Sequence, residues 1–240
     1  MAGYEKRSGC MKIITIFFAR NRKYNKLLNV FETSLKSCMP NVPYSRIEIK
    51  LPPNIDHKRD CAYAFLAAAN YVKEQKEKII VCDADLMFLQ SIEEINNYDF
   101  DIAITTRKKI KYNTGLWVYN PSSKSKKFLT RWIRYTNNLM NDFTNYEDFC
   151  WSHGGIDQAS LALTIEKNNE CKILELPCEI WNSTQSEWAL YNEETKVVHI
   201  KSKLRSLLFN RDRNAEIEDK YKYLIPLMEK WKGFSRNGNT

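Results

Sequence analysis

Hydrophobic positions change their spacing several times along the first third of the chain. Apolar residues fill positions 12–18 almost without interruption, which predicts a buried strand. From 23 to 38 they recur every three or four residues, as in a helix, and over 45–51 they alternate with polar residues, as in a second strand. An alanine-rich helix over 59–77 and an apolar strand over 78–82 follow. This alternation is typical of the start of a doubly wound parallel sheet.

The rest of the chain contains weaker signals of the same kind. We expect strands over residues 101–106, 115–119, 172–176 and 196–200, and helices over 122–139, 156–168 and 215–232. Ser122 is placed to cap its helix, and Pro226 is expected to interrupt the last one. No repeat, low-complexity tract or flexible linker divides residues 12–232, so we expect a single α/β domain with flexible ends at 1–11 and 233–240.

The composition is that of a globular protein, since 43% of the 240 residues are hydrophobic and 28% are charged. The longest apolar run, residues 13–19, is far shorter than the roughly 20 residues that span a bilayer. The start of the chain lacks the long apolar core of a secretory signal, so a cytoplasmic location is expected. The seven cysteines, an odd number without a C-x-x-C pair, argue against a disulfide framework and a zinc module.

The net charge of +8 alternates in sign along the chain rather than gathering in one stripe. Residues 107–134 carry nine basic and no acidic side chains, whereas 61–106 and 135–200 are acidic, at −5 and −8. A nucleic-acid-binding protein usually concentrates its basic residues on one face, so this class is disfavoured. Acidic blocks beside basic ones suit a metal-holding centre with basic walls for a phosphorylated ligand, although solvated helix faces also explain the 107–134 block.

Two carboxylates, Asp83 and Asp85, directly follow the apolar strand at 78–82. Ligands of an open α/β sheet bind beyond the carboxyl ends of its strands. Two acids there could simply cap the next turn, but against a buried strand they would repel each other unless a positive charge neutralised them. Mn²⁺ or Mg²⁺ takes such oxygen ligands and accepts water and phosphate oxygens at its remaining positions. The sequence therefore indicates a site for a metal ion and a phosphate group.

The sequence lacks the motifs of other classes of protein that bind phosphate groups. No G-x-x-x-x-G-K-[ST] loop or G-x-G-x-x-G turn occurs, which removes P-loop NTPases and dinucleotide-binding enzymes. Haloacid-dehalogenase-type phosphatases carry their D-x-D on the first strand, whereas this one follows the third. A sugar-nucleotide pyrophosphorylase remains as an alternative, although the basic segment 20–23 after the first strand contains no glycine. A non-catalytic nucleic-acid-binding protein is the other alternative, and it predicts salt-sensitive binding to any duplex.

Four segments in order, residues 79–86, 111–121, 154–158 and 197–201, resemble those of glycosyltransferases of the GT-A fold, in the neighbourhood of the glycogenin-like enzymes. The resemblance covers about residues 12–205. It implies one catalytic domain with a Rossmann-like, doubly wound mixed sheet flanked by helices. It also implies metal-dependent transfer of a sugar from a nucleotide-diphosphate donor, expected to be a UDP-sugar, to a hydroxyl of a glycan or small acceptor.

The resemblance implies roles for single residues. Asp83 and Asp85 would hold the metal and the diphosphate, with Asp83 also reaching the ribose, and His199 would complete the metal site. A histidine that is merely hydrogen-bonded at a strand end is the alternative. Lys201 or Lys203 would contact a phosphate. The other donor-binding candidates are Phe18, Ala19, Arg20, Arg59, Ala84, Asn113, Thr114, Gly155 and Gln158.

Asp157 has two candidate roles. Because it follows two glycines and begins a helix, the helix dipole favours its ionised form. It could take the proton from an acceptor hydroxyl, which would give inverting transfer. It could instead bind a hydroxyl of the donor sugar, as the Asp-Gln pair does in retaining members of the resembled group. Glu147 and Asp148 are rivals for the role of base.

Tryptophans in loop-like sequence are the candidates for the acceptor site. Trp181 and Trp188 lie in the acidic block, and sugars stack on exposed aromatic faces. Burial in a core is the commoner fate of tryptophan and is the alternative here. The sequence leaves the transferred sugar, the acceptor and the stereochemistry open.

Overall fold

The computed structural model describes residues 11–18, 22–50, 59–209 and 217–237. The expectation of flexible ends falls mostly on residues 1–10 and 238–240, which lie outside the described residues. The same is true of Ala19 and Arg20, two of the donor-binding candidates.

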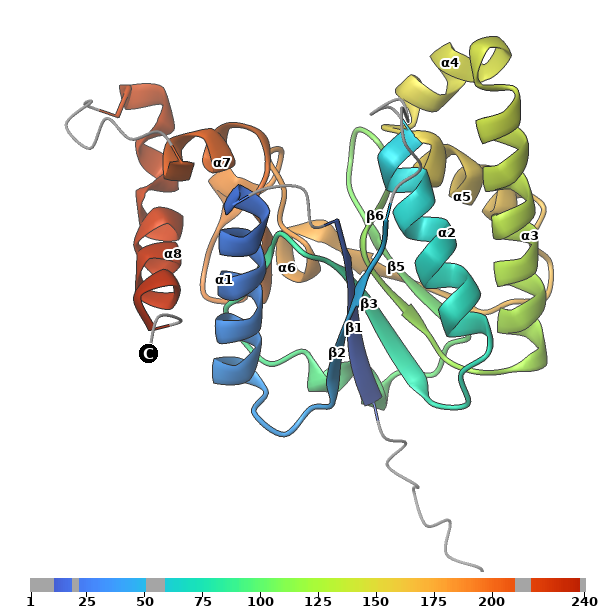
Figure 1. Cartoon of the computed structure of the whole chain (residues 1–240), viewed down its shortest axis with the longest axis horizontal. Helices are drawn as coiled ribbons and strands as arrows, with labels where there is room; N and C mark the ends of the chain where they lie inside the picture. Colours follow the sequence, from blue (N-terminus) through green and yellow to red (C-terminus); the bar gives the residue numbers. More distant parts are fainter. Residues whose placement is uncertain (1–10, 19–21, 51–58, 210–216, 238–240) are drawn as a thin grey trace, which may run out of the picture.

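A six-stranded mixed sheet forms the centre of the protein (Figure 1). Its strands, in sheet order, are β2 (Tyr44–Glu48), β1 (Met11–Phe17), β3 (Lys78–Asp83), β6 (Tyr112–Tyr119), β5 (Ile102–Thr106) and β7 (Ile173–Pro177). β1 pairs in parallel with β2 and β3, and β5 pairs in parallel with β7, whereas β6 is antiparallel to both of its neighbours. The expected doubly wound mixed sheet is confirmed. Strands β1, β3 and β5 therefore end at the edge of the sheet where β6 begins.

Helices cover both faces of this sheet (Figure 1). They are α1 (Arg22–Cys38), α2 (Asp60–Lys73), α3 (Ser123–Asn141), α4 (Phe143–Ser152), α5 (Ile156–Glu166), α6 (Cys178–Trp181), α7 (Ser202–Phe209) and α8 (Ile225–Asn237). Successive residues of a strand point to opposite faces, so Ile13 packs with Phe31 of α1 in one core while Ile14 packs with Phe65 of α2 in the other. None of the described helices is long and apolar enough to cross a membrane.

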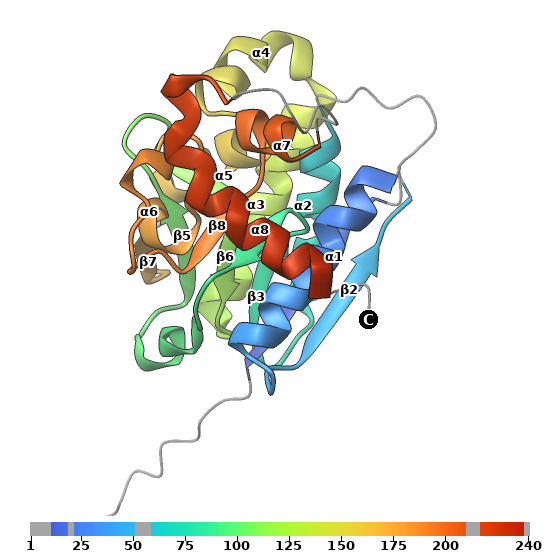
Figure 2. The same cartoon turned by 90° about the vertical axis from the view of Figure 1, so that its left-hand side faces the viewer.

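Helix α8 forms a further layer outside α1 (Figure 2). Leu27 and Val30 of α1 pack with Leu227 and Trp231 of α8 in a third hydrophobic cluster. Helix α1 is apolar on two sides for this reason, because it lies between the sheet and α8. The cysteines that the structure describes are all free thiols, as the odd count suggested.

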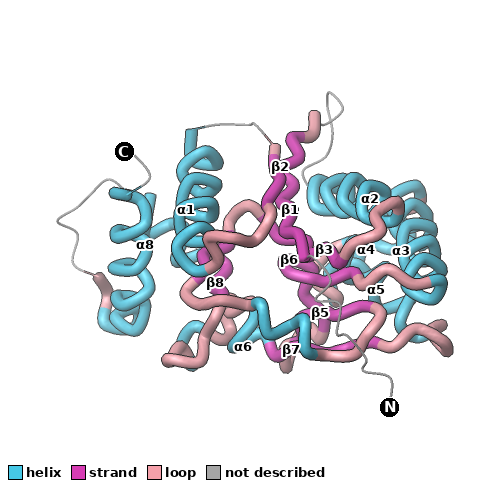
Figure 3. Tube along the Cα trace, turned by 90° about the horizontal axis from the view of Figure 1, so that it is seen from below, coloured by secondary structure: helices cyan, strands magenta, loops and turns pink. Residues whose placement is uncertain are grey.

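A second, two-stranded sheet stands beside the main one (Figure 3). It joins β4 (Leu86–Phe88) to β8 (Val197–His199) in antiparallel register, with Leu86 opposite His199. The pairing brings a segment from late in the chain to the end of β3. The sequence indicated β8 but gave no sign of β4, which has three residues.

The C-terminal helix corrects one expectation. Pro226 does not interrupt it but is its second residue, at a position where a helical N–H has no partner within the helix and proline is tolerated. A 3₁₀ turn, η4 (Asp219–Leu224), precedes α8, and α8 continues to Asn237, beyond the expected end at 232. Two shorter 3₁₀ turns, η2 (Glu93–Asn97) and η3 (Trp188–Leu190), complete the elements.

The predicted start of α3 is confirmed. Ser122 is its N-cap, where its hydroxyl accepts a hydrogen bond from the Ser125 N–H at 2.9 Å. The helices α4 and α7, in contrast, were not indicated by the sequence. Both lie near the edge of the sheet at which β3 ends (Figure 1).

Candidate active site

The C-terminal end of β3 lies between β1 and the beginning of β6. Cys82 pairs with Leu116, so the next residue, Asp83, is level with Gly115 of β6. On the other side Asp83 pairs with Ile16, so Phe18 lies just beyond the same edge. The register therefore brings two of the four segments and the donor-binding candidate Phe18 to one point.

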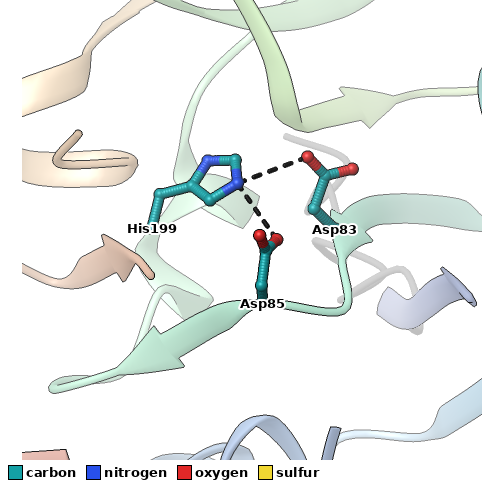
Figure 4. A group of neighbouring side chains, drawn as sticks. All are labelled: Asp83, Asp85 and His199. Atoms are coloured by element: carbon teal, nitrogen blue, oxygen red, sulfur yellow. Dashed lines mark ion pairs between the residues drawn. The ribbon is translucent and has the colours of Figure 1, made fainter. Parts of the chain in front are cut away.

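Asp83, Asp85 and His199 form a cluster at this edge (Figure 4). The His199 Nε2 lies 3.0 Å from Asp85 Oδ1 and 3.5 Å from Asp83 Oδ2. One potential ligand atom from each residue lies within 4.8 Å of the other two. His199 is buried, the Asp85 side chain is 14% exposed and that of Asp83 is half exposed, so the cluster opens to solvent on the Asp83 side. The structure thus brings together the three residues that the resemblance proposed as metal ligands.

The cluster fits a divalent cation in its choice of donors. Burial lowers the pKa of His199, which leaves a neutral imidazole with a lone pair for a metal. Loss of water and the neighbouring Asp85 carboxylate raise the pKa of Asp83, because two such acids repel each other. Burial acts in the same direction on Asp85, but His199 and the guanidinium of Arg205 lower its pKa to about 2. Two carboxylates and an imidazole leave coordination positions for water or phosphate oxygens.

The strand β8 and the bare backbone at Gly115 hold His199 in place. The His199 N–H donates to the Ser183 carbonyl, and the Ile200 N–H donates to the Asp85 carbonyl, both at 2.8 Å. A Cβ on Gly115 would lie 2.6 Å from Cε1 and 2.8 Å from Nδ1 of His199, closer than real side chains approach. The imidazole therefore occupies space that only glycine leaves free.

We expect Gly115→Ala to lower the affinity for Mn²⁺ by about tenfold or more, because the added methyl group would displace His199. Displacing a metal ligand should weaken metal binding at least as much as removing a hydrogen-bond partner that orients the ligand. Overpacking should also lower the free energy of unfolding by about 1–3 kcal/mol. Mn²⁺ binding followed by electron paramagnetic resonance and thermal unfolding measure the two effects. Gly233→Ala in α8 is the matched control, because nothing lies within 4 Å of the added Cβ. Unchanged Mn²⁺ affinity in Gly115→Ala would remove this glycine from the site.

The beginning of β6 bulges where the site lies. Ile104 of β5 pairs with Trp117, yet the next residue, Thr105, pairs with Asn113, so the three intervening residues of β6 are left out of the backbone pairing with β5. The Asn113 side chain fills the bulge: its Oδ1 accepts from the Gly115 N–H at 2.9 Å and from Asn182 Nδ2 at 3.0 Å. The sequence predicted a strand over 115–119, whereas β6 begins at Tyr112 and its first part is irregular. Asn113 is buried, and its Nδ2 has no partner among the described residues.

Asp157 lies beside this bulge, in the first turn of α5. Gly154 and Gly155, with φ of 86° and 137°, supply the positive backbone angles that lead into the helix. Asp157 is 5% exposed, and the Thr114 hydroxyl donates to its Oδ2. Burial raises the pKa of Asp157, while the Thr114 hydroxyl and backbone N–H groups act against that rise. The expected position at a helix N-terminus is confirmed.

The raised pKa of Asp157 predicts a stability cost at neutral pH. The unfolded chain ionises this group around its ordinary pKa of 3.8, while the fold still favours the neutral form. Wild-type stability therefore falls as the pH rises from about 4 to the folded pKa. We therefore expect Asp157→Asn to unfold at a higher temperature than wild type at pH 8, with the gain vanishing near pH 4. Thermal unfolding across this range measures it, with the exposed Asp99→Asn as control. An Asp157→Asn protein that is less stable at pH 8 would contradict the prediction.

Two arginines that the sequence analysis did not single out belong to the site. Arg205, on α7, is paired with Asp85 through Nη2 and donates from Nε to the Ile200 carbonyl at 2.9 Å. Arg107, directly after β5, donates from Nη2 to Gln158 Oε1 at 3.0 Å, and Gln158 Nε2 donates to the Gly154 carbonyl at 2.8 Å. Arg107 could have been found from its place at the end of a strand, whereas no local signal pointed to Arg205.

The remaining donor-binding candidates lie around the same edge. Ala84 is in the turn between β3 and β4, and Lys201 follows β8, where its N–H donates to the His199 carbonyl at 3.1 Å. Arg59 immediately precedes α2, and its guanidinium lies 5.8 Å from the ring of Phe143 in α4. No interaction in the described part of the chain joins Arg59 to the aspartate cluster.

The structure contradicts the prediction that Trp181 and Trp188 form the acceptor site. Trp181 is 4% exposed and Trp188 is 1% exposed, because α6 and η3 turn their rings into two hydrophobic clusters. The Trp188 Nε1 donates to the Ser183 carbonyl at 3.1 Å. Buried rings offer no face for stacking on a sugar, so the prediction for both residues was wrong. Trp151 on α4, in contrast, is 45% exposed.

No protein-family model matches the chain, and no curated protein matches it. Solved structures do match. The glycosyltransferase GlyE of Streptococcus pneumoniae TIGR4 superposes with a TM-score of 0.60 at 14% identity, over 94% of this chain and 60% of that one. The galactosyltransferase LgtC, in complex with donor and acceptor sugar analogues, gives 0.58 at 12% identity, over 95% and 96%. A glycosyltransferase involved in glycosylation of the major capsid of PBCV-1 gives 0.57 at 12% identity, over 82% and 96%.

These likenesses establish the fold, which is that of the GT-A glycosyltransferases. The chain spans 60% of the length of the GlyE chain that it matches. The resemblance inferred from the four sequence segments is confirmed at the level of the fold.

Proposed function

We propose that this chain, which has the fold of the GT-A glycosyltransferases, is a metal-dependent glycosyltransferase. It would move a sugar from a nucleotide-diphosphate donor, a UDP-sugar, to a hydroxyl of a glycan. The observation that carries this proposal is the cluster of Asp83, Asp85 and His199 at the C-terminal end of β3. That edge is where ligands bind in sheets of this kind.

The cluster would hold Mn²⁺ or Mg²⁺ against the diphosphate of the donor. When bound, such a cation neutralises negative charge that develops on the leaving diphosphate. Asp85 is prepared for this role, because Arg205 and His199 keep it ionised and fix its two oxygens. Lys201 is two positions beyond His199, and its positive charge acts to lower the pKa of both aspartates, which suits a contact with phosphate.

The donor sugar would lie between this cluster and the start of α5. Asp83 is level with Gly115 of β6, and the preceding residue, Thr114, donates to Asp157, so both carboxylates lie at the same part of β6. Asp157 would either accept the proton of the acceptor hydroxyl or bind a hydroxyl of the donor sugar. The Thr114 hydroxyl donates to Asp157, and Arg107 donates to Gln158, so these hydrogen bonds hold the side chains near the start of α5 in place. The LgtC complex with donor and acceptor analogues supports this pair of substrates for the fold.

A screen of donor hydrolysis tests the proposal, because many glycosyltransferases slowly hydrolyse their own donor. Nucleotide sugars with different bases and sugars are incubated with the protein, with Mn²⁺ or with a chelator, and the released nucleoside diphosphate is measured. We expect one UDP-sugar to be hydrolysed only with the metal, and Asp85→Asn to be inactive. Release of pyrophosphate from a nucleoside triphosphate and a sugar phosphate would indicate a pyrophosphorylase instead. Salt-sensitive duplex binding without hydrolysis would indicate a nucleic-acid-binding protein.

A further inference from the structure

A polar pocket of about 400 Å³ adjoins the candidate active site. Three cationic side chains line it, from Arg107, Lys109 and Lys201, together with three hydroxyl side chains, from Thr184, Ser186 and Ser202. No carboxylate is among the described residues that line it. Its volume lies within the range of small-molecule sites in proteins.

The part of the chain that the structure describes provides no ion-pair partner for the three cations of the pocket. Within the described ranges, no carboxylate lies at ion-pair distance from Arg107, Lys109 or Lys201, and Arg107 hydrogen-bonds only to the neutral oxygens of Ile110 and Gln158. Cations just outside the pocket do have such partners. Lys111 lies 2.7 Å from Glu175, and Lys203 lies 3.6 Å from Glu218. The pocket thus concentrates positive charge that an anionic ligand can use.

Two of the hydroxyl side chains that line the pocket are held by a buried carboxylate. The buried Glu187 accepts hydrogen bonds from the hydroxyls of Thr184 at 2.6 Å and Ser186 at 2.5 Å. The donor hydrogens of both hydroxyls are therefore used, and their oxygens remain as acceptors for hydroxyl groups of a ligand. Helix α7 begins at Ser202, so the positive end of its dipole adds to the charge of the pocket. These features together suit a ligand that carries both hydroxyls and a negative charge.

The position of the pocket distinguishes it from the diphosphate site. The charges at the diphosphate site already sum to zero. The two phosphates and the two aspartates are balanced by a divalent cation together with Lys201 and Arg205. Arg107 and Lys109 lie on the loop between β5 and β6, and no described contact joins either to the metal cluster. Arg107 is instead bonded to Gln158, the neighbour of Asp157. Their charge is therefore not required by the diphosphate and is available to a second substrate beside Gln158.

We propose that this pocket binds the acceptor and that the acceptor is an anionic sugar, with a carboxylate or phosphate group held by Arg107 and Lys109. This inference rests on the proposed function, since it assigns the second substrate of that reaction. Charge-assisted hydrogen bonds to one or two cations are stronger than neutral ones, so an anionic sugar should bind about tenfold more tightly than its neutral parent.

Calorimetry on the protein saturated with UDP and Mn²⁺ tests this. Glucose, galactose and mannose are compared with their uronates and their 6-phosphates, so that the two arms distinguish carboxylate from phosphate. We expect at least one anionic sugar to bind about tenfold more tightly than its neutral parent. Lys109→Ala should remove most of that difference. Lys108→Ala, an exposed neighbour that does not line the pocket, should keep it.

Equal affinities for the charged and neutral sugars, or no effect of Lys109→Ala, would overturn the inference. Competition between UDP with Mn²⁺ and the anionic sugar would also overturn it, because the cations would then serve the diphosphate. UDP binding is measured first in the same experiment. If UDP with Mn²⁺ does not bind, the proposed function itself fails; if it binds and the anionic sugars do not, only the inference about the acceptor fails.

Discussion

Asp85→Asn is expected to lower the Mn²⁺-dependent affinity for UDP by more than about 100-fold. Removing a group that only hydrogen-bonds a metal ligand already lowers metal affinity by about 10–100-fold, and Asp85 would be a ligand itself. Asp85 is the centre of the cluster: one oxygen lies 3.0 Å from His199 Nε2, and the other is paired with Arg205. An amide is a poorer ligand for a hard cation than a carboxylate, and it leaves the charge of Arg205 unbalanced beside the site. Calorimetric titration of UDP with and without Mn²⁺ measures the loss.

Asp99→Asn is the matched control for this variant. Asp99 is an exposed carboxylate paired with Lys172 at 2.7 Å, outside the site. Its replacement should leave UDP affinity unchanged, and circular dichroism should show that both variants are folded. If Asp85→Asn bound UDP with Mn²⁺ as tightly as wild type, the assignment of the metal to this cluster would be wrong.

Asp157→Asn should lower the rate of sugar transfer by about 10²–10⁴-fold, the range that a positioned acid or base contributes. The variant retains an oxygen for the Thr114 hydroxyl, so the bulge of β6 should stay in place. The affinity for UDP should not change, because UDP lacks the sugar that Asp157 would face. Transfer is followed by mass spectrometry of the product once the donor is known.

The two candidate roles of Asp157 separate in the affinity for the intact UDP-sugar. Unchanged affinity with lost transfer supports the base, and lower affinity for the UDP-sugar with unchanged affinity for UDP supports a contact with the donor sugar. Glu147→Gln and Asp148→Asn in α4 are the comparison variants, because both residues are rivals for the base. Full transfer activity in Asp157→Asn, or its loss in Asp148→Asn, would move the catalytic acid or base to α4.

Local patterns were sufficient for the elements that the chain builds from neighbouring residues. The apolar runs of β1 and β3, the cap at Ser122 and the helix start at Asp157 all depend on interactions within a few residues, and each was predicted correctly. The position of Asp83 and Asp85 followed from one rule about the ends of strands. His199 joined them only through the resemblance to known enzymes, because nothing nearby in the sequence reveals that β8 pairs with β4.

Long-range packing decided what the sequence did not reveal. Arg205 reaches Asp85 across 120 positions of the chain. The polar residues around Trp181 and Trp188 read as loops, yet α6 and η3 carry both rings into apolar clusters. The bulge of β6 arises from the register of two strands, which periodicity within one strand cannot show. Pro226 was interpreted as an interruption because the last helix was expected to begin at 215, whereas α8 begins at Ile225. Helix α8 packs against α1, and the local pattern does not show that contact.

Anomalous X-ray scattering from crystals grown with Mn²⁺ and UDP would locate the metal ion in the protein. We expect one manganese peak in coordinating contact with Asp85 and His199, next to Asp83, with the diphosphate of UDP bound to the same ion. A peak elsewhere in the protein, or UDP bound at this edge of the sheet with no manganese between it and the aspartates, would contradict it.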